Sequence, residues 1–383
     1  MWIRAKYAAA RGVDALLRLT ARSGQNVPRI PDRPRVLVVR CDHIGDAVMG
    51  TSVLRPLRDA LDASRLDVLA GPWAAEIFEG HPAVDEVLSC ATPWWSAARG
   101  ASLGERVRAW AELPSMIRTI NARRYDVGID LRGDLRQIAL FLRLGGMPIR
   151  VSSDRTGGRT LLTHVWTHDP RLHEVEKDAA IAALVGAAGP LRLHVAGLDG
   201  DIQELLPPDV ATSGYVVFAL RGSEENREWP EAHAAAAADA LHSELGLPSV
   251  IIGAGTDASL ATRVTALAAS PVVDLTGRTS LTQAAAVLRG ATAVVAVDSG
   301  PMHVAAAVGA PVVALFGPGD PRECRPWSDR AEVVSASAPC GCVGESCEFV
   351  KGAGRCMREI TPGMVVEAVL RARGCSGLAD ARW

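Results

Sequence analysis

The sequence predicts an α/β protein made of two doubly wound, Rossmann-like domains in series. Its 383 residues exceed what one hydrophobic core usually supports. Short β-branched segments alternate with helix-like segments, a pattern typical of parallel sheets with ligand sites at the carboxyl ends of the strands. The chain is 48% hydrophobic and 22% charged, which excludes a disordered or fibrous protein.

The first series of strands and helices begins at Arg35–Arg40, a short β-branched run. A loop containing one glycine follows, and then a helix-like segment over Ala47–Leu61. Further elements are expected as strands at Leu66–Ala70, Val84–Leu88 and Asp126–Asp130, and as helices at 74–78 and 103–122.

A stretch rich in Gly, Pro and Asp separates this series from a second one, and it lacks a sustained hydrophobic period. The second series is expected to have strands at Tyr215–Leu220, Ser249–Ile252, Thr292–Val297 and Pro311–Leu315, and helices near 231–245, 257–269, 281–289 and 301–308. The predicted organisation is an N-terminal extension (1–34), a first domain (35–190), a linker (191–214), a second domain (215–360), and a C-terminal helix (361–383) that could pack back on the first domain.

Charge and hydropathy limit the partners of the chain. A net charge of -2 without a basic, aromatic patch disfavours nucleic acid. No apolar run reaches the length of about 18 residues that a membrane span needs, and no secretion signal is recognisable, so a cytoplasmic protein is expected. Residues 1–24 form a basic amphipathic segment that could rest on the inner face of an anionic membrane; an ordinary docked helix is the alternative.

The strongest chemical motif is Val295–Val308, in which a buried strand ends in Asp298, Ser299 and Gly300 before Pro301 opens an Ala-rich helix. Backbone N–H groups at a helix start, with the positive end of the helix dipole, form a site for a diphosphate. His303 lies in the first helical turn and could donate a further hydrogen bond. The alternative is that Ser299 or Asp298 only caps the helix.

Four segments resemble the ADP-heptose lipopolysaccharide heptosyltransferases, glycosyltransferase family 9. They are DSGPMHVAAAVGAPVVALFGPGDP (298–321), VLVVRCDHIGDAVMGTSVLRPLRDAL (36–61), LRGSEENREWP (220–230) and LTGRTSL (275–281). They follow one another in the order of the family over most of residues 35–370. The resemblance implies the GT-B fold, in which an acceptor-binding first domain faces a nucleotide-sugar-binding second domain across a cleft.

The resemblance also implies an activity: inverting transfer of a heptose or related sugar from an ADP-sugar to a hydroxyl of a saccharide or lipid-linked glycan, without a catalytic metal. Asp46 matches the position of the family's general base, and capping of the following helix is the alternative. Asp42 and His43 are candidates for acceptor contact or for the base role, Arg132 is a candidate for acceptor contact, and a monomer is expected.

Donor-binding residues are expected in the second domain. Arg227 occupies a position where the family carries a basic residue that pairs with the diphosphate, with Ser223 beside it. The nucleoside and the diphosphate are expected near Asp257, Thr279, Ser280, Asp298, Ser299, Gly300 and His303.

Four cysteines, Cys340, Cys342, Cys347 and Cys356, lie within 17 residues. Four thiolates satisfy tetrahedral zinc, but this spacing is uncommon, and free thiols or a transient disulfide are the alternatives to a structural zinc site. Two other functions remain open: a dinucleotide enzyme of the NAD type, although the first loop lacks GxGxxG, and a non-catalytic nucleotide- or sugar-binding protein.

Overall fold

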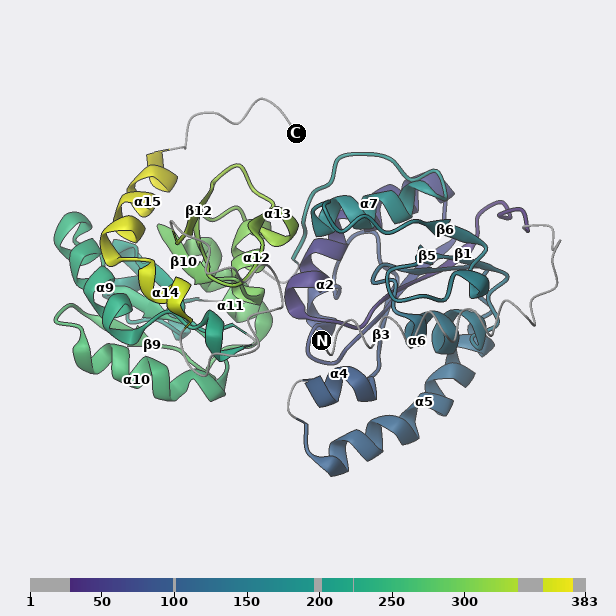
Figure 1. The fold of residues 1–383 in the computed structure, drawn as a ribbon, viewed down its shortest axis with the longest axis horizontal. Coiled ribbons are helices and arrows are strands. Elements are labelled where there is room, and N and C mark those ends of the chain that lie inside the picture. Colours follow the sequence, from purple (N-terminus) through teal and green to yellow (C-terminus); the bar gives the residue numbers. More distant parts are fainter. Residues whose placement is uncertain (1–27, 99–100, 196–201, 223, 337–353, 375–383) are drawn as a thin grey trace. The chain divides into compact units, whose positions relative to one another are not determined.

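The computed structural model describes residues 28–98, 101–195, 202–222, 224–336 and 354–374 (Figure 1). The chain divides into two compact units, Met1–Arg192 and Leu193–Trp383. Each unit holds one six-stranded sheet in which neighbouring strands are parallel. The two-domain α/β fold predicted from the alternating pattern is therefore confirmed.

In the first unit the strand order is β3-β2-β1-β4-β5-β6. The strands are β1 (Arg35–Arg40), β2 (Arg65–Ala70), β3 (Glu86–Ser89), β4 (Val127–Asp130), β5 (Ile149–Ser153) and β6 (His164–Trp166). The helices are α2 (Ile44–Gly50), α3 (Leu54–Leu61), α4 (Pro93–Ala98), α5 (Leu103–Arg123), α6 (Leu135–Gln137) and α7 (Glu174–Ala183), with a π-helix over Ile138–Arg143.

In the second unit the strand order is β12-β11-β10-β7-β8-β9. The strands are β7 (Val216–Ala219), β8 (Ser249–Ile251), β9 (Val272–Asp274), β10 (Ala293–Val297), β11 (Val312–Phe316) and β12 (Ala331–Ser335). The helices are α8 (Pro208–Ser213), α9 (Glu231–Leu245), α10 (Ala258–Leu267), α11 (Leu281–Gly290), α12 (Gly300–Ala307), α13 (Pro321–Cys324), α14 (Arg355–Glu359) and α15 (Pro362–Gly374).

Both sheets have the same topology, which fixes where a ligand site can form. The first strand of each sheet, β1 or β7, lies next to the fourth, β4 or β10, and the chain winds in opposite directions from this pair. Ligands of doubly wound sheets bind at this reversal, beyond the carboxyl ends of the strands. The loops after β1 and β4, and those after β7 and β10, are therefore the places to look for functional side chains.

The central strands are almost entirely apolar and buried, as strands covered on both faces must be. Strands β5, β6, β9 and β12 were not predicted, because they are short or only half-buried and show no long apolar run. The predicted helix at 74–78 is only a 3₁₀ turn, Ala75–Ile77. The predicted linker is less irregular than expected, because it contains α8 and the 3₁₀ turn Ile202–Glu204.

The helix α15, which covers the first part of the predicted C-terminal helix, belongs to the second unit. Val365, Ala368, Val369 and Ala372 are buried in the core that also holds Trp229 and the strands of the second sheet. The indole Nε1 of Trp229 donates a hydrogen bond of 3.0 Å to the carbonyl oxygen of Ile360, just before this helix. Helix α15 thus completes the core of the second unit.

Candidate functional site

The loop after β1 places Asp46 in the first turn of α2. This helix begins at Ile44, three residues earlier than the sequence pattern predicted, and its N-cap residue is His43. Asp46 is therefore inside the helix and is not its N-cap residue. A carboxylate in a first turn is favoured by the helix dipole, and 12% of this side chain remains exposed.

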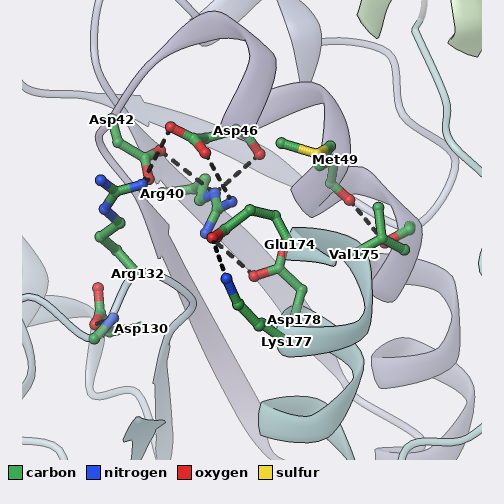
Figure 2. Close-up of polar contacts among 12 residues, drawn as sticks. Arg40, Asp42, Asp46, Met49, Asp130, Arg132, Glu174, Val175, Lys177 and Asp178 are labelled. Atoms are coloured by element: carbon green, nitrogen blue, oxygen red, sulfur yellow. Dashed lines mark hydrogen bonds and ion pairs between the residues drawn. The ribbon is translucent and has the colours of Figure 1, made fainter. Parts of the chain in front are cut away.

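Arg132 connects this carboxylate to the loop that follows β4. Its Nη1 atom lies 3.3 Å from Oδ2 of Asp46 and 3.7 Å from Oδ2 of Asp42 (Figure 2). Asp46 and Arg132 follow β1 and β4, so the pair spans the reversal of the first sheet. The structure brings together three of the residues that the sequence analysis selected.

A fully buried arginine, Arg40, lies beneath these residues at the end of β1. Its Nε atom donates to the backbone oxygen of Asp46 at 2.9 Å and lies 3.4 Å from Oδ1 of Asp42. Its Nη1 atom is 3.2 Å from Oδ1 of Asp178, and its Nη2 atom is 3.8 Å from Oδ1 of Asp46. One guanidinium group therefore holds three carboxylates in place.

Helix α7 supplies the remaining charges of this network. Glu174, Lys177 and Asp178 are all buried, and Lys177 and Asp178 follow Glu174 by three and four residues, which puts them on the same side of the helix. Lys177 Nζ lies 2.8 Å from Oε1 of Glu174, and Arg155 Nη1 lies 3.2 Å from the same oxygen. Figure 2 shows Glu174, Lys177 and Asp178 gathered beside Arg40 and Asp46.

The network shifts the pKa values of Asp42 and Asp46, the two aspartates that follow β1, in opposite directions. Burial raises the pKa of Asp42 to about 6, against the opposing charge of Arg40. Burial would also raise the pKa of Asp46, but Arg132 and Arg40 hold it well below its usual range. Asp46 is therefore a carboxylate at any physiological pH, and Asp42 titrates near neutrality.

Two tryptophans of α4 lie against arginines that follow β4. The ring of Trp95 lies 4.7 Å from that of His43, edge to face, and the guanidinium of Arg132 lies 5.5 Å from the Trp95 ring centroid. The guanidinium of Arg136 lies 4.9 Å from the Trp94 ring centroid. Cation–π contacts of this kind orient both arginines.

A buried aspartate fixes the loop that carries Arg132. Oδ2 of Asp130 accepts hydrogen bonds from the backbone of Gly133 at 2.7 Å and of Asp134 at 3.1 Å, and from Ser152 Oγ at 2.9 Å. Gly133 adopts a φ of 69°, which favours glycine. Arg132 is therefore presented by a tightly folded turn.

The second sheet carries an arginine–aspartate pair at the equivalent place. Arg227, after β7, donates from Nη1 to Oδ2 of Asp298, after β10, at 2.7 Å. A side chain at Gly319 would place its Cβ 2.5 Å from that same carboxylate oxygen, and one at Gly222 would place its Cβ 3.1 Å from the Asp298 backbone oxygen. Gly222 and Gly319 therefore leave room for the Arg227–Asp298 pair.

The helix α12 starts beside this pair. Its N-cap residue, Ser299, makes no capping hydrogen bond; its hydroxyl donates instead to the backbone oxygen of Val297 at 3.0 Å. The alternative in which Ser299 caps the helix is therefore wrong. Gly300 and Pro301 begin the helix, and His303 is buried in its first turn. The backbone N–H groups at the start of α12 form the kind of site that binds an anion.

The other predicted donor residues follow β8 and β9 at the same edge. Oδ2 of Asp257 accepts a hydrogen bond of 2.9 Å from the backbone N–H of Ala254, and Nε of Arg221 lies 3.7 Å from Oδ1 of Asp257. Ser280 is the N-cap residue of α11 and forms a capping box with Gln283, so its hydroxyl has a structural task. Thr279 is half-buried beside it.

Several predicted features fall outside the described residues. They are Ser223, the basic segment 1–24, and Cys340, Cys342 and Cys347 of the predicted zinc site. Cys356 is described, and it is buried in α14. Within the described part of the chain, no group of three or more His, Cys, Asp or Glu side chains could hold a metal ion, and no helix is long and apolar enough to cross a membrane.

The sequence analysis missed Arg40, Arg155, Glu174, Lys177 and Asp178. The sequence did contain a signal in α7. Lys177 and Asp178 follow Glu174 by three and four residues, the spacing of side chains that face a core from one side of a helix. Charged side chains at such spacing are usually solvated. Only the position of α7 beside α2 shows that these charges are buried.

Comparisons with known proteins agree on one family. Residues 114–351 match the model of "Glycosyltransferase family 9 (heptosyltransferase)". Lipopolysaccharide heptosyltransferase 2 of Salmonella typhimurium is 26% identical over 87% of this chain and 97% of its own.

Two solved structures share the fold. A family 9 glycosyltransferase from Veillonella parvula has a TM-score of 0.75 at 23% identity, covering 91% of this chain and 99% of its own. The Escherichia coli ADP-heptose lipopolysaccharide heptosyltransferase II has a TM-score of 0.72 at 23% identity, covering 88% and 98%.

Proposed function

The chain belongs to glycosyltransferase family 9, and from this premise we propose that it transfers a heptose, or a related sugar, from an ADP-sugar to a hydroxyl group of a saccharide acceptor. The relatives that it resembles are named lipopolysaccharide heptosyltransferases, and one solved neighbour is named for ADP-heptose. A saccharide or lipid-linked glycan is therefore the proposed acceptor, and an ADP-sugar the proposed donor.

One observation carries the donor side of this proposal. At the carboxyl edge of the second sheet, the guanidinium of Arg227 pairs with Asp298, and α12, whose N-cap side chain forms no capping hydrogen bond, begins two residues later. A guanidinium has five N–H donors, so an arginine that pairs through Nη1 can also bind phosphate oxygens. These groups would stabilise the charge that develops on the departing ADP.

Asp46 is the proposed general base. As the acceptor oxygen forms its bond to the anomeric carbon, the hydroxyl proton passes to the Asp46 carboxylate. The bond between the anomeric carbon and the diphosphate oxygen breaks, and ADP leaves with the electron pair. Attack opposite to the leaving group inverts the anomeric configuration. The low pKa of Asp46 keeps the group ionised before the reaction, as a general base must be.

His43 and Arg132 are proposed to face the acceptor, whereas Asp42 is fully buried and is proposed only to hold Arg132 in place. The indole of Trp95 packs against His43 and Arg132, so these groups form one surface. The carboxylates of this loop also argue against a dinucleotide enzyme, since Asp42 and Asp46 would repel a pyrophosphate at the place where the first domain of such an enzyme binds it.

Calorimetric titration with ADP, UDP, GDP and NAD tests the donor. We expect selective ADP binding that weakens about tenfold or more in Arg227→Ala, the loss typical of one charge-assisted contact. Arg322→Ala is the matched control, because Arg322 also pairs with an aspartate but is largely exposed. A preference for UDP or GDP would discard the ADP-sugar, and tight NAD binding would discard the transferase mechanism proposed here.

The base assignment has a separate test. Asp46→Asn should keep ADP affinity while its single-turnover rate with ADP-heptose and an acceptor falls by about 100-fold or more. An unchanged rate would remove Asp46 from the reaction.

A further inference from the structure

The first half of α5 exposes an apolar stripe that its own core does not use. Leu103 is 75% exposed, Val107 59% and Trp110 60%. Successive members of this set lie four and three residues apart, so they share one face of the helix. Pro114, also exposed, continues the same stripe four residues later.

The buried side of α5 is a different face. Ala109, Leu113 and Ile120 are buried, and the last two belong to the core of the first unit. The apolar surface of α5 therefore extends well beyond the part that packs on the sheet. A solvated helix would carry polar residues at these positions.

Exposed large apolar side chains concentrate around this helix. Among the described residues there are seven in all, and three of them lie together in the first half of α5. Single exposed leucines need no explanation, but a cluster does.

Basic side chains flank the stripe. Arg106 lies three residues after Leu103 and four before Trp110, and Arg118 lies four after Pro114; both are exposed. Within the part of the chain that the structure describes, neither forms an ion pair. Other exposed arginines do, for example Arg55 with Asp59 at 2.8 Å and Arg171 with Asp169 at 2.7 Å. The arginines beside the stripe are therefore available to an anionic surface.

The stripe is also connected to the candidate acceptor side. The ring of Trp110 lies 6.4 Å from that of Trp94, edge to face. The next residue, Trp95, packs on His43, three residues before Asp46. A surface that binds α5 would therefore lie on the same side of the first unit as the loop of Asp42 and Asp46.

From these observations we propose that α5 docks on an anionic lipid bilayer, with Leu103, Val107 and Trp110 inserted among the headgroups and Arg106 and Arg118 against the lipid phosphates. Apolar side chains, a tryptophan and flanking arginines on one helix are the features that bind such an interface. The contact would bring the enzyme to an acceptor that is itself held in the bilayer. This last consequence rests on the proposed function, whereas the docking does not.

Flotation of the full-length protein with phosphatidylglycerol/phosphatidylcholine vesicles, without donor or acceptor, tests the proposal. Leu103→Ser/Trp110→Ser should weaken binding at least about tenfold, since two apolar side chains lose their burial. Val107→Glu, which leaves the Trp110–Trp94 contact intact, should do the same. Leu267→Ser on α10 is the matched control, because Leu267 is 56% exposed, and it should change nothing.

The charge contribution has its own variant. Arg106→Gln/Arg118→Gln should bind these vesicles roughly tenfold more weakly, and the difference should vanish on pure phosphatidylcholine. Arg171→Gln/Arg322→Gln removes the same charge elsewhere and should leave binding unchanged.

Either of two flotation results, or one result on the oligomeric state, would overturn the proposal. One is wild-type protein that fails to float. The other is wild-type binding that survives all the α5 variants, which would place the contact elsewhere, as on residues 1–24. A concentration-dependent dimer that Val107→Glu dissociates, with no effect on vesicles, would assign the stripe to a second copy instead. ADP affinity, measured on each variant, reports separately on the proposed transferase site.

Discussion

Nη1 of Arg132 lies 3.3 Å from Oδ2 of Asp46, and this ion pair joins the loops after β1 and β4, where the first sheet reverses its winding. The guanidinium stabilises the carboxylate form and so makes it a weak base. A general base works best when its pKa is near the working pH. Arg132 therefore sets how strongly Asp46 can pull a proton, in addition to any contact with the acceptor.

Replacing Arg132 should change the pH dependence of catalysis. In Arg132→Gln the pKa of Asp46 rises, so the acid limb of the kcat/KM profile should move to higher pH by about one unit or more. Arg136→Gln is the control, since Arg136 also lies over a tryptophan but pairs with Asp134. Identical acid limbs in the wild type and Arg132→Gln would contradict this account of Asp46.

Asp42 should make stability depend on pH. Its folded pKa of about 6 exceeds the usual value of about 3.9, so its contribution to stability is complete below pH 4 and is lost as the pH rises through 6. Asparagine cannot titrate. The free energy of unfolding of Asp42→Asn, relative to the wild type, should therefore rise by about 2 to 3 kcal/mol between pH 4 and 7.5.

Urea denaturation at each pH measures this difference. Asp59→Asn, on the exposed face of α3, provides the control, and its relative stability should change by less than about 1 kcal/mol. A relative stability of Asp42→Asn that is flat across this range would show that Asp42 does not titrate near neutrality.

The buried position of Arg40 predicts a large loss of stability when it is removed. Arg40→Met leaves the carboxylates of Asp42, Asp46 and Asp178 without their shared partner and should lower the free energy of unfolding by about 3 to 5 kcal/mol. Arg55→Met breaks an exposed pair of similar length and should cost less than about 1 kcal/mol. Thermal or urea unfolding of both variants compares them, and equal losses would refute a structural role for the network.

Gly319 should be intolerant of a side chain. The added Cβ of Gly319→Ala would lie 2.5 Å from Oδ2 of Asp298, so the carboxylate must leave its place beside Arg227. We expect a stability loss of about 1 to 3 kcal/mol and weaker ADP binding. Gly363→Ala meets nothing within 4 Å and should have neither effect. Unaltered ADP affinity in Gly319→Ala would separate the Arg227–Asp298 pair from donor binding.

Ser280 allows helix capping to be told apart from donor binding. Ser280→Ala removes a capping box and should cost about 1 kcal/mol of stability. Ser102→Ala removes the same motif from α5 and should cost about as much. If Ser280 also contacts the donor, calorimetry should find weaker ADP binding in Ser280→Ala alone, and equal affinities would leave Ser280 only its structural role.

The sequence allowed the strands nearest each reversal to be predicted because β1 and β10 are long apolar runs. It was less informative at the edges, where β9 and β12 are half-buried and short, so their residues look like loop residues. Helix starts were also inexact: α2 begins at Ile44 through a backbone turn with no capping side chain to mark it.

The residues of the candidate site also divide into those that the sequence indicates and those that only the fold reveals. Asp46, Asp298 and Arg227 could be selected because they follow apolar strands in segments that resemble one family. Arg40 could not be distinguished from an ordinary strand-end arginine, and Asp178 lies more than 130 residues further along the chain. Their ion pair arises only when α7 packs beside α2, a tertiary contact that no local pattern encodes.

The place of α15 in the second core has a consequence for synthesis on the ribosome. Strand β1 and the other strands of the first sheet are complete by residue 166, so this unit can fold while the rest of the chain is still being translated. The second sheet must wait, because Trp229 and the strands beside it stay uncovered until residues 357–372 have left the exit tunnel. Folding of the half of the molecule that carries Arg227 and Asp298 therefore waits for α15, the last described helix of the chain.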